Sequence, residues 1–204
     1  MDSDDRRGLF LVVEGIDGAG KTTQVRMLGE ALRNAGREVV VSHEPTDGPW
    51  GKKARQSARS GRMSLEDELH AFIEDRKQHL RELILPSLDA GKVVLLDRYF
   101  YSTIAYQGAR GMEVSDLTER MKAFARVPDR VYLLDLSPTE ALRRISQSRG
   151  EAPNLFEKEE NLIAVRGIFQ QLAQQEECML VVDSSGGEAE IHTEIWRDLQ
   201  TLRT

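Results

Sequence analysis

The sequence lacks the features that mark several classes of protein. It contains a single cysteine, Cys178, which excludes an internal disulfide and a zinc site built from cysteines. It has no apolar run close to the ~20 residues of a membrane-spanning helix, and no signal-peptide pattern follows its first residues. It also lacks a basic excess, because the net charge is −6, which disfavours general binding to nucleic acids. We therefore expect a cytoplasmic protein that binds neither a membrane nor a nucleic-acid polymer.

What remains is the composition of an ordinary soluble domain. Hydrophobic residues make up 40% and charged residues 30%, a balance that opposes wholesale disorder. No internal repeat, low-complexity tract or proline-rich linker divides the 204 residues. Because this length is typical of one domain, we expect a tail over residues 1–8 and a single domain over residues 9–204.

Short apolar runs alternate with amphipathic helical stretches along the chain. The runs suit strands buried on both faces of a parallel sheet, and they occupy residues 9–14, 38–42, 93–97, 131–135 and 179–183. Helices are expected over residues 21–35, 50–60, 64–89, 99–126, 138–147, 157–177 and 188–202. The alternation predicts an α/β three-layer sandwich built from βαβ units. Residues 146–156, which contain glycine, proline and serine, are predicted to form a mobile loop.

The first apolar run is followed by a glycine-rich octet. Residues 15–22 read Gly-Ile-Asp-Gly-Ala-Gly-Lys-Thr and match every fixed position of G-x-x-x-x-G-K-[ST]. The glycines let backbone N–H groups surround phosphate oxygens, while Lys21 reaches the β- and γ-phosphates and Thr22 offers a hydroxyl to Mg²⁺. A chance turn between strand and helix is the alternative, but the full octet in this context predicts binding of a nucleoside triphosphate. The residues expected to bind it are Gly15, Ile16, Asp17, Gly18, Ala19, Gly20, Lys21, Thr22 and Thr23.

The phosphate loop alone does not choose between a switch, a motor and a transferase. A guanine-specific switch usually carries an N/T-K-x-D segment, and no such tetrapeptide occurs in the sequence. A motor or oligomeric ATPase normally needs a longer chain. Transfer to a small acceptor fits this length better, so the rest of the sequence should contain an acceptor pocket.

The predicted helix that begins near Ser64 carries a charged residue on its apolar face. Arg76 lies in the middle of the apolar stripe, four residues after Phe72. A guanidinium on such a face needs a dedicated partner, so an internal ion pair or a snorkelling side chain is one interpretation. The other is a nucleotide-binding pair, in which Phe72 stacks on a base and Arg76 donates hydrogen bonds to it.

Polar residues also follow the apolar run 93–97. Ligands of open parallel sheets bind beyond the carboxyl ends of the strands, so Asp97 and Arg98 should face the same crevice as the phosphate loop. Asp97 would then hold Mg²⁺ through water, and Arg98 would clamp an acceptor phosphate. A helix cap paired with an arginine is the alternative. Thr103 and Gln107 share a helix face and are able to read a base edge, although such a pair usually marks a solvated face.

Three segments together resemble the thymidylate kinase family in order and spacing. They are the phosphate loop, residues 72–79 (Phe-Ile-Glu-Asp-Arg-Lys-Gln-His) and residues 97–107 (Asp-Arg-Tyr-Phe-Tyr-Ser-Thr-Ile-Ala-Tyr-Gln), and the resemblance extends from about Leu9 to about Leu172. It implies the fold of P-loop nucleoside monophosphate kinases, with a five-stranded parallel sheet, and a homodimer. It also implies transfer of the γ-phosphoryl group of ATP to dTMP with Mg²⁺.

The resemblance assigns roles to residues by position. It implies that Phe72 stacks on thymine, that Arg76 contacts its O4 atom and that Thr103 lies near N3. Tyr106 would crowd the 2′ position of the sugar and so favour deoxyribose, and Asp17 would approach the 3′-hydroxyl. The complete acceptor-binding set expected from these arguments is Asp17, Glu44, Arg55, Phe72, Arg76, Arg98, Thr103, Tyr106 and Gln107.

The resemblance also implies a lid over residues 143–157 that closes over ATP. Family members without an arginine in the phosphate loop usually supply one from the lid, and this phosphate loop has none. Arg144 and Arg149 are the candidates; Arg144 is expected to bind ATP and Arg149 is preferred for catalysis. The expected catalytic residues are therefore Lys21, Arg98 and Arg149.

Some positions depart from the family pattern. His43 stands where an arginine is common, Trp50 lies in a stretch that is commonly glycine-rich, and residues 154–157 (Asn-Leu-Phe-Glu) replace a frequent Asp-Arg pair. These departures leave open a kinase for another deoxynucleoside monophosphate. An ATP-binding regulatory module without transfer is a further alternative, although its intact phosphate loop and Asp97-Arg98 pair argue against it.

Overall fold

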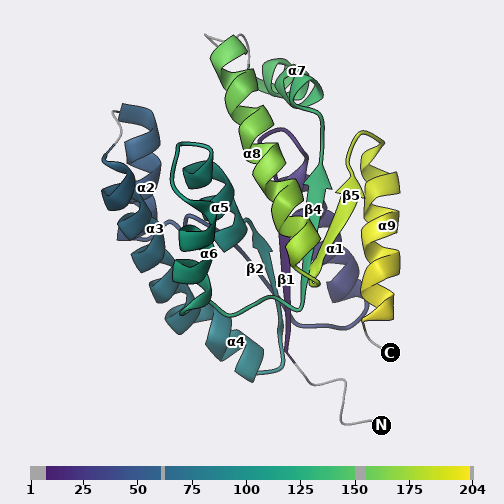
Figure 1. Cartoon of the computed structure of the whole chain (residues 1–204). Coiled ribbons are helices and arrows are strands. Elements are labelled where there is room, and N and C mark those ends of the chain that lie inside the picture. The colour runs from purple at the N-terminus through teal and green to yellow at the C-terminus, as the bar shows by residue number, and fades with distance from the viewer. Residues whose placement is uncertain (1–7, 61–62, 150–154, 203–204) are drawn as a thin grey trace.

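A computed structural model describes residues 8–60, 63–149 and 155–202. Five strands form one parallel sheet in the order β2-β3-β1-β4-β5 (Figure 1). This confirms the predicted α/β class and the five-stranded parallel sheet. Each strand lies within one residue of a predicted apolar run at either end; the strands are β1 (Leu9–Gly15), β2 (Val39–His43), β3 (Val93–Asp97), β4 (Arg130–Asp135) and β5 (Met179–Asp183).

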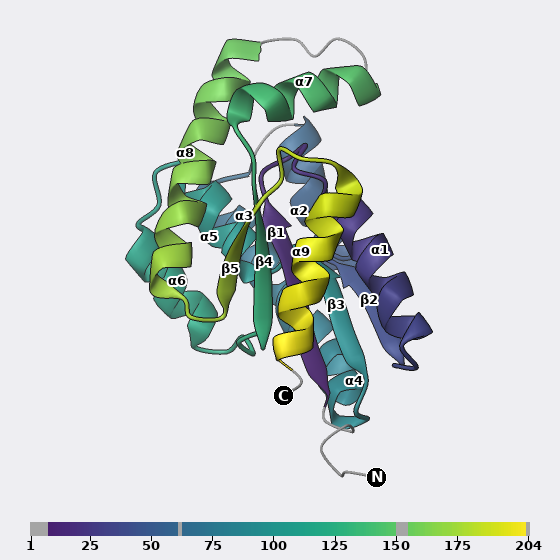
Figure 2. The same ribbon diagram turned by 90° about the vertical axis from the view of Figure 1, so that its right-hand side faces the viewer.

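Helices cover both faces of the sheet. One face carries α1 and α9, and the other carries α5 and α8, which gives three layers (Figure 2). The pair α2 and α3 packs together beside α5, and α7 packs against α8. The α-helices among the described residues are α1 (Lys21–Asn34), α2 (Pro49–Ser60), α3 (Leu65–His79), α4 (Leu85–Asp89), α5 (Phe100–Gly108), α6 (Val114–Lys122), α7 (Pro138–Arg149), α8 (Leu155–Gln175) and α9 (Glu188–Thr201).

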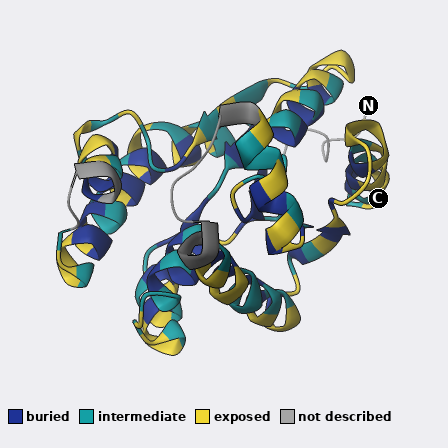
Figure 3. Cartoon of the chain, turned by 90° about the horizontal axis from the view of Figure 1, so that it is seen from above, coloured by how far each residue is buried: buried dark blue, intermediate teal, exposed yellow. Residues whose placement is uncertain are grey.

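The core lies between the sheet and these two helical layers. The middle strands are buried on both faces, as their continuous apolar sequences predict, and Phe10 to Val13 of β1 are 0% exposed. Viewed onto the carboxyl ends of the strands, buried residues face the interior and exposed residues lie on the outer helix faces (Figure 3). No helix in the described part of the chain combines the length and the apolar character needed to cross a membrane.

Two predicted helices and one predicted loop differ from the structure. The helix expected over residues 99–126 is two helices, because Gly111 adopts a left-handed φ of 101° that ends the first one. The stretch 64–89 is helical but contains a π-helical turn, Leu80–Ile84, that ends two residues before Pro86, whose ring would clash with a regular α-helical turn. The loop expected over residues 146–156 is shorter, because α7 continues to Arg149 and α8 begins at Leu155. Residues 150–154 of that loop lie outside the described residues.

Strand register brings three connections to one edge of the sheet. Asp97 at the end of β3 is level with Val13 of β1 and with His43 of β2. The residues that follow, in the phosphate loop after β1, at Arg98 after β3 and at Glu44 after β2, therefore begin at the same height. This edge carries the candidate site.

Candidate active site

The phosphate loop joins β1 to α1 in a conformation that requires glycine. Gly15 and Gly18 have φ values of 142° and 85°, and a Cβ atom on either would lie 2.6 Å from a backbone oxygen of Leu134 or Ala141. The loop ends at Gly20, and α1 begins at Lys21 without a side-chain cap. Its first N–H groups are therefore available to an anion. Ile16, Asp17 and Ala19 lie in the same loop, and Thr22 and Thr23 lie in the first turn of α1.

Lys21 is held inside this loop. Its side chain donates a hydrogen bond of 2.8 Å to the carbonyl oxygen of Ile16, and the residue is 7% exposed. Burial, reinforced by repulsion from Arg98, lowers the pKa of Lys21 to about 8. The ammonium group is thus poorly solvated and would gain strongly from a phosphate ligand.

Thr22 and Asp97 provide the oxygen groups expected for Mg²⁺. The Thr22 hydroxyl donates a hydrogen bond of 2.6 Å to the Asp97 carboxylate, so strand β3 and helix α1 meet at this point. Hydroxyl and carboxylate oxygens are the ligands that Mg²⁺ prefers, usually together with phosphate and water, and so the pair fits this ion. The described residues contain no cluster of three or more metal-binding side chains.

A cavity of about 380 Å³ lies beside the phosphate loop. All nine residues expected to bind the acceptor line it, although they extend from Asp17 to Gln107 in the sequence. They come from the phosphate loop, the connections that follow β2 and β3, and helices α2, α3 and α5. The other lining residues are Pro45, Ala54, Glu68, Tyr99, Ser102, Arg110 and Asn161.

Arg98 lies between the phosphate loop and the cavity. Its guanidinium donates hydrogen bonds to the carbonyl oxygen of Gly15 at 3.3 Å and to the Ser102 hydroxyl at 3.0 Å. It also forms an ion pair with Asp17 and lies 5.2 Å from the ring centroid of Tyr106. Burial opposes the charge, but Tyr106 and Asp17 outweigh it and raise the pKa of Arg98, so the side chain stays cationic. Arg98 also adopts a φ of 69°, which is unusual for a residue other than glycine.

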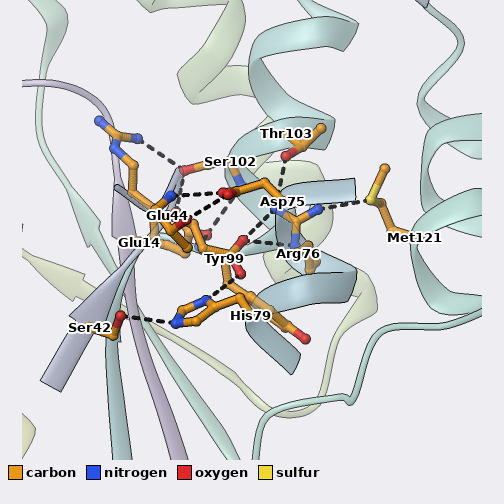
Figure 4. A network of polar contacts seen from close by, with 12 residues as sticks. Glu14, Ser42, Glu44, Asp75, Arg76, His79, Tyr99, Ser102, Thr103 and Met121 are labelled. Atoms are coloured by element: carbon orange, nitrogen blue, oxygen red, sulfur yellow. Dashed lines mark hydrogen bonds and ion pairs between the residues drawn. The ribbon is translucent and has the colours of Figure 1, made fainter. Parts of the chain in front are cut away.

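Arg76 occupies the wall of the cavity and is 1% exposed. Its Nε and Nη2 atoms lie 2.8 and 2.7 Å from Oε2 of Glu44, and Nη2 donates to the Thr103 hydroxyl at 3.1 Å (Figure 4). Its Nη1 atom lies 3.1 Å from the sulfur of Met121. The internal ion pair is therefore present, and the same guanidinium lines the cavity together with Phe72.

Comparison with known proteins gives a consistent result. A family model described as thymidylate kinase matches residues 13–195. A thymidylate kinase of Xanthomonas euvesicatoria pv. vesicatoria (strain 85-10) is 53% identical over 165 residues, which cover 81% of this chain and 72% of that protein. A thymidylate kinase of Xylella fastidiosa (strain M12) is 52% identical over 162 residues, 79% of this chain and 74% of that protein. The chain belongs to the thymidylate kinase family.

Gln107 has partners that the family resemblance did not indicate. Its Nε2 atom donates to Glu68 at 2.9 Å, and its Oε1 atom accepts from Arg110 at 3.1 Å. Glu68 is 3% exposed and also pairs with Arg110 and with the Ser57 hydroxyl. Sequence reasoning missed Glu68 and Arg110. A signal was available, since Glu68 precedes Phe72 by four residues and so shares its helix face.

Glu14 is a second residue that sequence reasoning missed. It is 0% exposed and accepts hydrogen bonds from the backbone N–H groups of Tyr99 and Ser102 at 2.7 and 3.1 Å, and from the Ser102 hydroxyl at 2.6 Å. Burial raises the pKa of Glu14, while these hydrogen bonds and the charge of Arg98 oppose the rise. The carboxylate fixes the start of α5 and with it the loop that presents Arg98. The acidic end of the first apolar run was the available signal.

Two of the positions that depart from the family pattern, His43 and Trp50, are described by the structure. Among the described residues, neither His43 nor Trp50 lines the cavity. His43 lies near Asp47, and Trp50 packs edge-to-face on His70 with ring centroids 5.5 Å apart. Arg55, in contrast, lines the cavity and pairs with Asp47 at 2.7 Å.

The two arginines predicted to belong to a lid, Arg144 and Arg149, lie on α7. Arg144 pairs with Glu140 at 3.0 Å and donates to the carbonyl oxygen of Ser184 at 3.0 Å, so it faces the connection between β5 and α9. Arg149 is the last residue of α7, and its side chain lies outside the described residues. Its catalytic role therefore stays a prediction.

Proposed function

We propose that the chain transfers the γ-phosphoryl group of ATP to dTMP, giving dTDP. The observation that carries this proposal is the cavity beside the phosphate loop, which combines an aromatic ring, Phe72, with the hydrogen-bonding pair Arg76 and Thr103. A planar base would stack on the ring and meet the polar pair at its edge. Arg98 lies between the phosphate loop and this cavity, where a phosphate of the acceptor would meet the phosphates of the donor.

The proposed mechanism depends on position and charge. The acceptor atom is an oxygen of a phosphate that is already anionic near neutral pH, so no general base is required. Lys21 and the N–H groups at the start of α1 hold the donor phosphates, and Arg98 holds the acceptor phosphate. Both cations reduce repulsion between the two anions and stabilise the charge of the transferring group.

Mg²⁺ and a lid arginine complete the proposed machinery. Thr22 directly, and Asp97 through water, would hold the ion, which supplies positive charge to the β- and γ-phosphates when bound. We propose residues 143–157 as the lid, with Arg149 as its catalytic arginine and Arg144 as an ATP contact. Closure of the lid would exclude water and suppress wasteful hydrolysis of ATP.

Three organisational features belong to the same proposal. Residues 9–204 would act as one kinase domain after the tail 1–8. Two copies would form a homodimer, which is the state that the family resemblance implies. A cytoplasmic location suits an enzyme whose substrates are ATP and a free nucleotide.

The proposed function predicts a sharp acceptor preference. With ATP and Mg²⁺, formation of ADP should be fastest with dTMP, by about tenfold or more over dUMP, UMP, CMP, AMP and GMP. The reason is that Arg76 and Thr103 would select the base while Tyr106 would select the sugar. A coupled assay of ADP formation measures the profile. Preference for another acceptor would indicate a kinase for a different nucleotide, and binding of ATP without any transfer would indicate a regulatory module.

The low pKa of Lys21 predicts a pH dependence for ATP. Only the protonated amine attracts phosphate. Well below pH 8, Lys21 is therefore protonated in almost all of the free protein, and this fraction falls as the pH rises through the pKa of about 8. We expect kcat/KM for ATP to fall by up to about tenfold per pH unit above that value, since this ratio reports the free enzyme. The control is kcat at saturating ATP, which should fall less because bound phosphate stabilises the protonated amine. A value of kcat/KM that stays constant to pH 9.5 would contradict the assignment.

A further inference from the structure

A buried histidine supports the arginine in the cavity wall from behind. His79 is 6% exposed, and its Nδ1 atom lies 3.0 Å from Oε1 of Glu44 (Figure 4). Its Nε2 atom lies 2.9 Å from the hydroxyl of Ser42 on β2. Sequence reasoning assigned no chemical role to this residue, because nothing in the spacing of His79 and Glu44 indicates that they meet.

The Glu44 carboxylate divides its two oxygens between two residues of α3. Oε2 contacts Nε and Nη2 of Arg76. Oε1 forms a hydrogen bond with His79, which follows Arg76 by one helical turn. The side chains of Arg76, Glu44 and His79 are only 2%, 4% and 4% exposed, so water cannot easily replace a missing partner. A carboxylate can only accept hydrogen bonds, so Nδ1 of His79 carries a proton and donates it.

This arrangement fixes the direction of the Arg76 guanidinium. With both carboxylate oxygens occupied, Glu44 is held in one orientation, and Nη2 of Arg76 is then held against Thr103. Arg76, Glu44 and Thr103 line the cavity, whereas His79 is not among the described residues that do so. His79 can therefore affect a bound acceptor only through Glu44 and Arg76.

We propose that His79 is a positioning residue for recognition of the acceptor base, acting through Glu44 on Arg76. The inference rests on the proposed function, because it takes the acceptor to be dTMP and Arg76 to contact its base. Loss of the Nδ1 hydrogen bond leaves Oε1 of Glu44 buried without that partner, and the carboxylate then turns to find another. Arg76 moves with it and loses its alignment with Thr103.

Three substitutions at this position separate the two nitrogen atoms of the ring. The side-chain N–H₂ group of asparagine lies close to where Nδ1 of histidine lies, and that of glutamine lies close to Nε2. We expect His79→Ala and His79→Gln to raise KM for dTMP about tenfold, the size typical of a lost hydrogen bond to a buried charged group. His79→Asn, which keeps a donor toward Glu44, should stay within about threefold of the unchanged chain. KM for ATP should change less than twofold in all three, since Lys21 and Thr22 make their side-chain hydrogen bonds to Ile16 and Asp97 and not to His79 or the Glu44 carboxylate.

The steady-state measurements need two controls. His70→Asn changes an exposed histidine on the same helix and should leave both KM values unchanged. Thermal unfolding of each variant identifies general destabilisation, which would not by itself raise one KM and spare the other.

The outcomes are distinguishable. A rise in KM for dTMP with alanine and glutamine but not with asparagine supports the inference. Equal KM values for all variants, or equal losses with both substrates, would overturn it and leave His79 as a residue of the core. If the unchanged chain does not phosphorylate dTMP at all, the proposed function fails, and this inference fails with it.

Discussion

Replacing Lys21 with alanine should lower kcat for phosphoryl transfer by at least about 10³-fold while the chain stays folded. The lysine is the only side-chain cation of the phosphate loop itself, and it acts in a site with little water, where a charge contributes far more than in solution. Single-turnover kinetics with saturating ATP measure the loss directly. A variant that keeps a near-normal rate would show that Lys21 does not contact the transferring group.

Lys21→Met provides the matched control for stability. The folded protein holds this lysine with a pKa near 8 rather than the ordinary 10.5, so at neutral pH the buried charge opposes folding. This loss of folding free energy is at its full size below pH 8 and disappears as the pH rises toward 10.5. A methionine of similar length removes it, so the variant should unfold at the same or a higher temperature at pH 7 while remaining inactive. A variant that is both inactive and strongly destabilised would contradict this separation of the two roles.

Replacing Arg98 with alanine should lower kcat by about 10³-fold, comparable to the loss of an arginine that stabilises a phosphoryl-transfer transition state. The expected loss is large because Arg98 lies between the phosphate loop and the acceptor cavity and stays cationic there. The measurement is kcat at saturating ATP and dTMP.

Arg98→Lys is the matched control for this prediction. Both substitutions keep a Cβ atom at a φ of 69°, so they share whatever backbone strain the position imposes. Lysine retains the charge but not the planar set of donors, and it should recover part of the lost rate, with kcat between those of the alanine variant and the unchanged chain. Equal rates for the alanine and lysine variants would show that the charge of Arg98 does not act in catalysis. An unchanged kcat with only KM for dTMP raised would limit Arg98 to binding.

The sequence predicted the parts of the site that depend on local pattern. The phosphate loop has fixed residue types because backbone geometry and phosphate chemistry require them, and strand ends were visible because the apolar runs stop there. Arg98 could be placed in the crevice because it follows a buried parallel strand, and Arg76 attracted attention because it interrupts an apolar face. Their roles with substrates stay predictions, whereas their positions around one cavity are now described.

The parts that could not be predicted depend on contacts between distant segments. Glu44 and His79 are 35 residues apart and meet only because α3 packs beside the end of β2. Glu68 of α3 pairs with Arg110, which lies just after the end of α5, and such a partnership has no signature within either segment. The buried polar network in the cavity wall is thus set by tertiary packing. This explains why the sequence indicated Arg76 and Glu44 but not their contacts with each other and with His79.

The turn around Gly111 determines what lies behind Arg76 in the cavity wall. A continuous helix over residues 99–126 would carry Met121 about 30 Å along its axis from Phe100, at 1.5 Å per residue. Because the chain reverses between Gly108 and Val114 instead, α6 returns alongside α5, and the sulfur of Met121 reaches Nη1 of Arg76. The guanidinium is therefore contacted from three sides, by Glu44 after β2, Thr103 of α5 and Met121 of α6. A turn outside the cavity lining thus places Met121 against the arginine of the cavity wall.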